Sequence, residues 1–436
     1  MRAESLVADP GAIEGIASAI QSGKTDPVAL VERSFARIAA VEKSVQGFCL
    51  LDRERALAEA RVLRQEAKAR RLRSALHGIP VAIKDVLDVA GLPTRAGSKT
   101  RAENALSTID SHVVTLLKAA GAIVVGKAHT TEFAYFDGPP PTRNPHNLAH
   151  TPGGSSAGPA AVVAAGMVPL SLGTQTAGSV SRPAAYCGIS AFKPSTLAWS
   201  SSGLVPFAPS FDTVGVFAYR VRDAVAAARG LMPPFLHQRG VAAPSPLTIG
   251  VLEDPIVEAA SAAVTDSIKV AAGTLGRSGL KVERITSPVA FTEIAGWHKT
   301  IIEYEVAHAH PHLERNSDVS AGLREAIARG RVIPDRAYLD AHVALNIARE
   351  RFWLSTAQAD ALLFPAAPDV APAGMKTGDP RFIVPYTALG GPIVSIPVAV
   401  GPGVLPLGLM LIGAPGSDAR IAGIAEQIAP AIELPR

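Results

Sequence analysis

Two segments of this 436-residue chain share one order of elements: a helix, a glycine and then a strand. In SHVVTLLKAAGAIVVGKAH (111–129), an amphipathic helical pattern stops at Gly121 and the apolar run AIVVGK follows. The segment IKVAAGTLGRSGLKVERIT (268–286) repeats this order and ends in the strand-like run LKVERI. Helices that alternate with strands along a chain build α/β folds, so the sequence predicts helices packed on a sheet.

Other apolar runs extend the expected sheet. The runs GIPVAIKDVLDVA (78–90), LTIGVLED (247–254) and ADALLFPAAPD (359–369) are short and apolar, as buried strands are. The most apolar stretch, residues 392–416, is cut repeatedly by proline and glycine, which a membrane helix of about 20 residues tolerates poorly. It is better read as two strands, IVSIPVAV and LGLMLIG, joined by a turn. The expected fold class is therefore α/β, with a mixed, mostly parallel β-sheet sandwiched between helices.

Helical patterns fill most of the remaining chain. Residues 10–70 carry apolar residues at three- and four-residue spacing, with Asp26 as a candidate N-cap before Pro27. Because no long polar linker interrupts the chain, we expect one domain over residues 1–436. Its expected parts are a helical N-terminal region, a central region, a largely helical region after the proline-rich break at 233–246, and a C-terminal return to the sheet: residues 1–74, 75–230, 247–357 and 358–436.

Composition and charge narrow the possible classes of function. Hydrophobic residues make up 48% and charged residues 18% of the chain, which is typical of a globular protein with a sizeable core. The net charge of +4 is small for this length, so nucleic-acid binding is not expected. The two cysteines, Cys49 and Cys187, are far apart, and the N-terminus lacks an apolar leader. These features favour a cytoplasmic protein without a disulfide framework or a membrane partner.

The stretch PGGSSAG (152–158) contains the pattern G-x-S-x-G, from Gly154 to Gly158. In α/β-hydrolases this pattern places a nucleophilic serine directly after a strand. Here the turn-rich segment RNPHNLAHTP comes before the glycines, so we do not interpret the match as a nucleophile elbow.

The segment HAHPH offers three histidines, His308, His310 and His312, which could bind a metal ion if they alternated along a strand. The surrounding pattern is helical, and positions i and i+2 of a helix do not face each other. We therefore expect a solvated helix face and no metal site.

Two other features each allow two interpretations. The small residues of LGTQTAGSVSRPAAYCG (172–188) could let backbone N–H groups converge on one point, as in an oxyanion hole, or could form an ordinary loop around Ser179. Lys84 closes the apolar run of residues 78–84. Its ammonium group could be buried and therefore act as a base near neutral pH, or it could reach water from the end of a strand.

Taken together, these segments carry a specific pattern. GIPVAIKD, PGGSSAG and GTQTAGSVSRPAAYCG follow one another in this order, with 24 positions from Ser155 to Ser179. The combination resembles the amidase signature family of Ser-Ser-Lys hydrolases, and it resembles malonamidase-like members most. The resemblance runs from residue 75 to residue 220 and continues more thinly to the C-terminus through GGPIVSIPV and LGLMLIG. It implies the amidase signature fold, with residues 75–230 as the catalytic core and residues 247–357 as a variable region on the substrate side.

The resemblance implies a role for each matching residue. Ser179 corresponds to the nucleophile, Lys84 to the base, and Ser155 to a bridging serine that follows Gly154 through a cis peptide bond. The implied oxyanion hole consists of the backbone N–H groups of Thr176, Ala177, Gly178 and Ser179. The implied substrate contacts are Arg182, Gly154 and Tyr135, and Thr174 and Ser156 would support the catalytic residues.

Four positions depart from the common family pattern. Ala157 and Pro159 replace more usual glycine and serine, and a proline is acceptable in the first turn of a helix. Ala177 replaces a common glycine but keeps its backbone N–H. Gln175 stands where many members carry aspartate, which leaves the surroundings of the catalytic residues open.

The implied activity is hydrolysis of a small carboxamide to an acid and ammonia or an amine, through an acyl-Ser179 intermediate and without a metal or organic cofactor. The alternatives are the amidase subunit of a tRNA-dependent amidotransferase and a catalytically inactive binding homologue. The identity of the amide stays open. Arg182 either binds a substrate carboxylate or is structural, and the aromatic residues of TTEFAYFDG (130–138) line an apolar pocket or belong to the core. The expected partner is a small-molecule amide, and the sequence is compatible with a homodimer.

Overall fold

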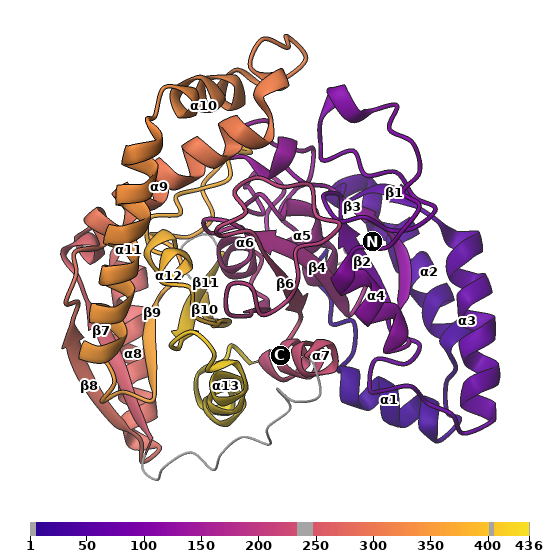
Figure 1. Ribbon diagram of the computed structural model, residues 1–436. Helices are drawn as coiled ribbons and strands as arrows, with labels where there is room; N and C mark the ends of the chain where they lie inside the picture. The colour runs from indigo at the N-terminus through magenta and orange to yellow at the C-terminus, as the bar shows by residue number, and fades with distance from the viewer. Residues whose placement is uncertain (1–5, 233–246, 401–404, 436) are drawn as a thin grey trace.

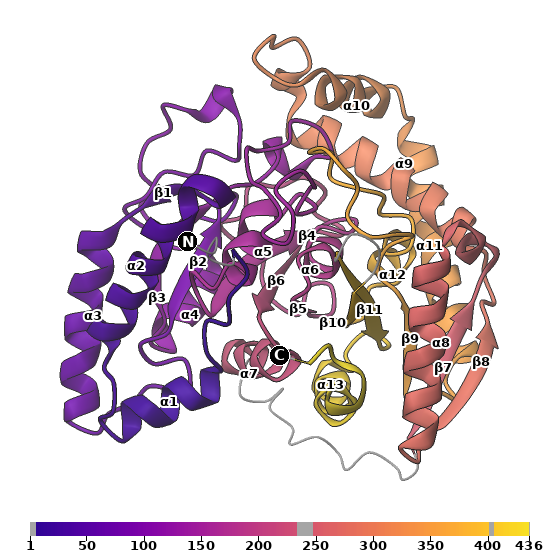
Figure 2. The same cartoon turned by 180° about the vertical axis from the view of Figure 1, so that it is seen from behind.

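The computed structural model describes residues 6–232, 247–400 and 405–435. Within these residues the strands form one eleven-stranded sheet in the order β1-β3-β2-β4-β6-β5-β10-β11-β9-β7-β8. Helices cover the sheet, as Figures 1 and 2 show from opposite sides. The α/β architecture expected from the sequence is confirmed. The proline-rich break at 233–246 and the turn at 401–404 lie outside the described residues.

The strands are short and mostly buried. Their bounds are β1 Phe48–Leu51, β2 Pro80–Lys84, β3 Ile123–Ala128, β4 Leu170–Gln175, β5 Ser190–Lys193, β6 Thr213–Ala218, β7 Thr248–Glu253, β8 Lys281–Thr286, β9 Ala361–Pro365, β10 Ile393–Val400 and β11 Pro406–Ile412. The sheet is mixed. Parallel pairing joins β3, β2 and β4 on one flank and β9, β7 and β8 on the other, whereas the strands between these blocks run antiparallel. The expected parallel pairing is therefore found in these two blocks of the mixed sheet.

The helices begin and end largely where the sequence signals predict. Asp26 caps α2 by accepting hydrogen bonds from the N–H groups of Val28 and Ala29. Gly121, with φ of 92°, separates α4 from β3. The α-helices are α1 Ile13–Gln21, α2 Pro27–Val45, α3 Arg53–Lys68, α4 His112–Ala119, α5 Ala157–Ala164, α6 Ser181–Tyr186, α7 Val221–Leu231, α8 Ala262–Arg277, α9 Phe291–Ala309, α10 Ala321–Arg331, α11 Asp335–Ser355, α12 Val384–Leu389 and α13 Asp418–Ile432.

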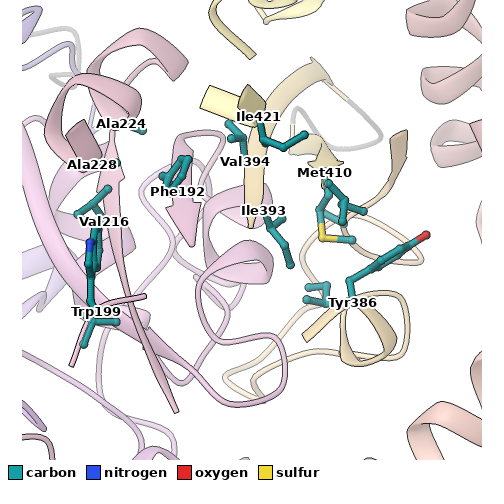
Figure 3. Packing of buried hydrophobic residues seen from close by; sticks show 14 of the residues in the cluster. Phe192, Trp199, Val216, Ala224, Ala228, Tyr386, Ile393, Val394, Met410 and Ile421 are labelled. Atoms are coloured by element: carbon teal, nitrogen blue, oxygen red, sulfur yellow. The ribbon is translucent and has the colours of Figure 1, made fainter. Parts of the chain in front are cut away.

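Alternation along the strands builds a core on each face of the sheet. On β2, Val81 and Ile83 belong to the cluster that includes α1, α4 and α7, whereas Ala82 belongs to the cluster that includes α2, α3 and α5. Successive side chains of a strand point to opposite faces, which explains this division. Figure 3 shows part of the first cluster, with Phe192 and Val216 on the central strands and Ile393 and Met410 on the C-terminal hairpin.

Two expectations of the sequence analysis are wrong in detail. The segment 10–70, expected to be helical, contains the edge strand β1, which pairs antiparallel with β3. Four residues are too few for a strand periodicity to stand out between two helices. Of the three histidines in HAHPH, His308 and His312 are exposed, whereas His310 is buried and its ring centroid lies 4.8 Å from that of Phe133. The helix α9 ends at Ala309, so His310 turns inward instead of continuing a solvated face.

No helix among the described residues is long and apolar enough to cross a membrane. Within the same part of the chain, no group of three or more histidine, cysteine, aspartate or glutamate residues is arranged to hold a metal ion.

Candidate active site

Lys84 ends strand β2 and is completely buried. Its Nζ donates hydrogen bonds to Oγ of Ser155 over 2.7 Å and to Oγ1 of Thr174 over 2.8 Å. Thr174 lies on β4, which pairs in parallel with β2 and so brings its side chain beside the lysine. The structure therefore brings together Lys84, Ser155 and Thr174, three of the residues singled out from the sequence.

Burial controls the charge of this lysine. Removal from water disfavours the ammonium form, and it lowers the pKa of Lys84 well below the usual 10.5. The carboxylate of Asp212 acts in the opposite direction and raises this pKa, but it is the smaller of the two effects. Lys84 is therefore poised to lose its proton far more readily than a lysine in water. Of the two interpretations left open by the sequence, the structure supports the buried lysine.

Ser155 follows Gly154 through a cis peptide bond, as the resemblance implies. The segment has no room for larger side chains, since a Cβ on Gly154 would lie 2.5 Å from Cγ2 of Thr377. The next residue, Ser156, ties α5 to β4: its Oγ donates to the carbonyl oxygen of Thr174 and accepts from the N–H of Thr174, both over 3.2 Å. Ser155 is thus held on a tightly packed loop directly in front of Lys84.

Ser179 lies on the loop between β4 and α6, and we call this loop together with the first residue of α6 the nucleophile loop (residues 176–181). Its side chain is nearly buried, and no hydrogen bond links it to Ser155 among the described residues. The backbone N–H groups of Ala177, Gly178 and Ser179 have no acceptor within the same described set. They are available to donate to a bound oxygen atom, which is the property an oxyanion hole requires.

Gln175, the last residue of β4, supports the nucleophile loop through hydrogen bonds. Its Oε1 accepts hydrogen bonds from the N–H groups of Val180 and Ser181, each over 2.9 Å. Its Nε2 donates to Oγ1 of Thr387 over 2.9 Å, and that hydroxyl donates to the carbonyl oxygen of Ala177 over 2.6 Å. Only an amide group can both accept and donate hydrogen bonds here, because a carboxylate has no N–H to donate. Gln175, at the position where many family members carry aspartate, therefore supports the nucleophile loop directly and through Thr387.

Asp212 and His298 support the same loop, although no motif in the sequence marks either residue. Asp212 accepts a 2.5 Å hydrogen bond from Oγ1 of Thr176 and is itself held by the N–H groups of Phe207 and Ala208. His298 of α9 donates through Nε2 to the carbonyl oxygen of Thr176 over 2.8 Å. Burial lowers the pKa of His298 to about 4, so the ring is neutral at pH 7.

Arg182 connects the two loops. Its backbone N–H donates to the carbonyl oxygen of Gly178, and its Nη2 donates to the carbonyl oxygen of Gly154 over 2.6 Å. The side chain is completely buried, and its Nε and Nη1 have no hydrogen-bond partner among the described residues. Burial lowers the pKa of the guanidinium to about 10, which still leaves it charged at neutral pH.

Comparison with known proteins identifies the family of this chain. The family model described as Amidase matches residues 29–422. A glutamyl-tRNA(Gln) amidotransferase subunit of Roseiflexus sp. (strain RS-1) is 33% identical, with 91% of each chain covered. The chain belongs to the amidase family. Another relative of this amidase, the corresponding amidotransferase subunit from Picosynechococcus sp. (strain ATCC 27264 / PCC 7002 / PR-6), is 31% identical over 88% of the chain and 90% of the relative.

Solved structures of related proteins superpose closely on this amidase. A chain from a vestigial complex that bears on the origins of an s-triazine catabolic enzyme superposes with a TM-score of 0.88 at 30% identity, covering 98% of this chain and 100% of that one. The peptide amidase from Stenotrophomonas maltophilia superposes with a TM-score of 0.83 at 26% identity, with 98% of each chain covered. The amidase is thus a C–N hydrolase of the amidase signature fold. The finer resemblance to malonamidase-like members stays a prediction.

Proposed function

We propose that this amidase hydrolyses a small carboxamide to a carboxylic acid and ammonia or an amine, through Ser179, Ser155 and Lys84. The observation that carries the proposal is the buried Lys84, whose Nζ lies 2.7 Å from Oγ of Ser155. A buried lysine with a lowered pKa is the base that a hydroxyl relay needs near neutral pH.

The proposed reaction begins with two proton transfers. Neutral Lys84 accepts the proton of Ser155 as Ser155 accepts that of Ser179, and Oγ of Ser179 attacks the amide carbon. The negative charge on the former carbonyl oxygen is stabilised by the N–H groups of the nucleophile loop, Thr176 to Ser179. The proton returns through Ser155 to the leaving nitrogen, the C–N bond breaks, and acyl-Ser179 remains. Water, deprotonated by the same relay, then hydrolyses this ester and regenerates Ser179.

A second candidate is the amidase subunit of a tRNA-dependent amidotransferase, in which ammonia would pass to a partner. The names of the curated relatives favour it, and these relatives are matched over about nine-tenths of their length. In that case tRNA and further subunits would be partners of the complex. A third candidate, an inactive binding homologue, is less well supported because Lys84, Ser155 and Ser179 are all present.

One experiment separates these candidates. The purified chain alone is incubated with a panel of primary and N-substituted amides, and ammonia and acid are measured, with Ser179→Ala as the control. We expect turnover of at least one simple amide that the control lacks. No turnover, combined with labelling of Ser179 by a fluorophosphonate, would favour the amidotransferase candidate; no turnover and no label would favour the inactive homologue.

We infer that Arg182 acts on the cis-peptide loop and does not bind a substrate carboxylate, because its Nη2 already donates to Gly154 from a fully buried position. Arg182→Ala should lower kcat/KM by a similar factor, about tenfold or more, for a carboxylate-bearing amide and for a neutral amide of equal size. A loss confined to the acidic substrate would instead assign the unpartnered Nε and Nη1 to a carboxylate clamp.

A further inference from the structure

A cavity of about 290 Å³ opens beside the nucleophile loop, with Ala177 in its wall. One side consists of three aromatic residues, Tyr135, Phe136 and Phe207. The ring centroid of Tyr135 lies 5.5 Å from that of Phe136 and 5.7 Å from that of Phe207, so the rings form one continuous apolar surface. The TTEFAYFDG segment therefore contributes Tyr135 and Phe136 to a cavity.

The other side is aliphatic and comes from elements far along the chain. Ile302 and Val306 lie one turn apart on α9, and Val384 begins α12. Helix α9 belongs to the region expected from the sequence to be variable and on the substrate side. Figure 1 shows α9 and α10 together at one end of the molecule. The cavity thus lies between the nucleophile loop and this helical region.

The cavity interior carries little charge. His298 is neutral at pH 7 because burial depresses its pKa to about 4. Of the charged lining residues, Glu303 and Arg329 form an ion pair with 2.9 Å between Oε1 and Nε, and Lys299 is exposed to solvent. Burying an unpaired carboxylate against the aromatic and aliphatic walls would cost free energy, whereas burying apolar surface there is favourable.

We propose that this cavity binds the acyl group of the substrate, and that this group is uncharged and apolar, either an aromatic ring or a short aliphatic chain. The inference rests on the proposed function, since Ala177 belongs to the oxyanion hole only if Ser179 is the nucleophile. Because the N–H of Ala177 would then bind the carbonyl oxygen, the group attached to the carbonyl carbon lies within reach of the cavity. A volume near the lower end of the range for small-molecule sites, about 300–1,000 Å³, limits that group to roughly one ring or a few carbons.

The first test varies the acyl group while ammonia remains the leaving group. We measure kcat/KM for acetamide, butyramide, hexanamide, phenylacetamide and 3-phenylpropionamide. The value should rise about three- to fourfold per buried methylene and reach on the order of 100-fold above acetamide for a ring-bearing amide. A flat series would overturn the proposal. So would a preference for adipamate over hexanamide, or a gain seen only when the apolar group is placed on the amide nitrogen.

The second test narrows the cavity. Ala295 of α9 lines it, so Ala295→Leu should lower the ratio of kcat/KM for 3-phenylpropionamide to that for acetamide by at least tenfold. Thr292→Leu is the matched control, because Thr292 lies on the same helix but is exposed and outside the cavity. Equal ratios in the two variants would contradict the assignment.

A binding measurement separates this inference from the proposed function. In the Ser179→Ala background, calorimetry should show 3-phenylpropionamide binding at least tenfold more tightly than acetamide, and Ala295→Leu should remove the difference. If the wild type hydrolyses no amide but this preference is present, the proposed function fails, and with it the role of the cavity as an acyl-group site, although the cavity still binds apolar groups. If amides are hydrolysed and neither kcat/KM nor binding responds to the acyl group, the cavity assignment fails alone.

Discussion

Replacing Ser179 by alanine is expected to reduce kcat on amides by on the order of 10⁴-fold or more, because the change removes the atom that forms the acyl-enzyme. Ser155→Ala should leave only a trace of activity, since Ser155 relays protons between Ser179 and Lys84. Neither variant should disturb the fold greatly, because each removes a single oxygen atom from a small side chain.

The chain offers a matched control for this prediction. Ser181 lies two residues further along the same loop, and its buried Oγ has no hydrogen-bond partner among the described residues. Its contact with Gln175 uses the backbone N–H, which alanine keeps. Ser181→Ala should therefore retain most of the activity. Mass spectrometry after treatment with a fluorophosphonate should find the label on Ser179, and a label on Ser155 or Ser156 would refute the assignment.

Replacing Lys84 by alanine is expected to lower kcat/KM by about 10²- to 10⁴-fold, the range typical of a lost general base. In the wild type, the neutral amine is the active form. The rate should therefore fall as the pH decreases through the pKa of Lys84, which burial places well below 10.5, and it should rise towards a plateau at higher pH. The measurement is a pH profile of kcat/KM for wild type and variant.

A second buried lysine tests whether this profile belongs to Lys84. Burial lowers the pKa of Lys193 to about 8, and its Nζ donates to the carbonyl oxygen of Pro194 over 2.6 Å. Lys193→Met should keep the wild-type profile, because the hydrogen bond of Lys193 goes to Pro194, whereas Ser155 receives its hydrogen bond from Lys84. The Ser-Ser-Lys relay is wrong if Lys193→Met loses the fall in rate at low pH. It is also wrong if Lys84→Ala keeps near-normal rates and an unchanged pH profile.

Local sequence patterns were sufficient to predict much of the architecture. The helix–glycine–strand order at Gly121, the cap at Asp26 and the two strands of the C-terminal hairpin all appear where the residues predict them. These features depend on neighbours within a few positions, through backbone conformation, capping hydrogen bonds and periodic burial. The edge strand β1 was missed because its stability comes from pairing with β3, more than 70 residues away along the chain.

The candidate active site likewise contains residues that local motifs reveal and residues that they do not. The order and spacing of three short segments were enough to single out Lys84, Ser155 and Ser179, because each segment carries its own residue types. The supporting contacts of the nucleophile loop were not predictable from those segments. Asp212 contacts Thr176 from 36 positions away, His298 from 122, and Thr387 contacts Ala177 from 210. A lone aspartate, histidine or threonine has no local signature of such a contact.

By itself, then, the sequence determined the fold class, the family resemblance and the candidate catalytic residues, since these follow from local periodicity and from motifs of a few residues. The tertiary structure decided the properties that depend on distant neighbours. It buried Lys84 completely, which lowers its pKa, and it turned the Arg182 side chain onto the carbonyl oxygen of Gly154. It also joined Tyr135 and Phe136 to α9 and α12 around one cavity. Burial, charge and cavity shape each depend on all the elements that pack around a site, so no single segment of the chain specifies them.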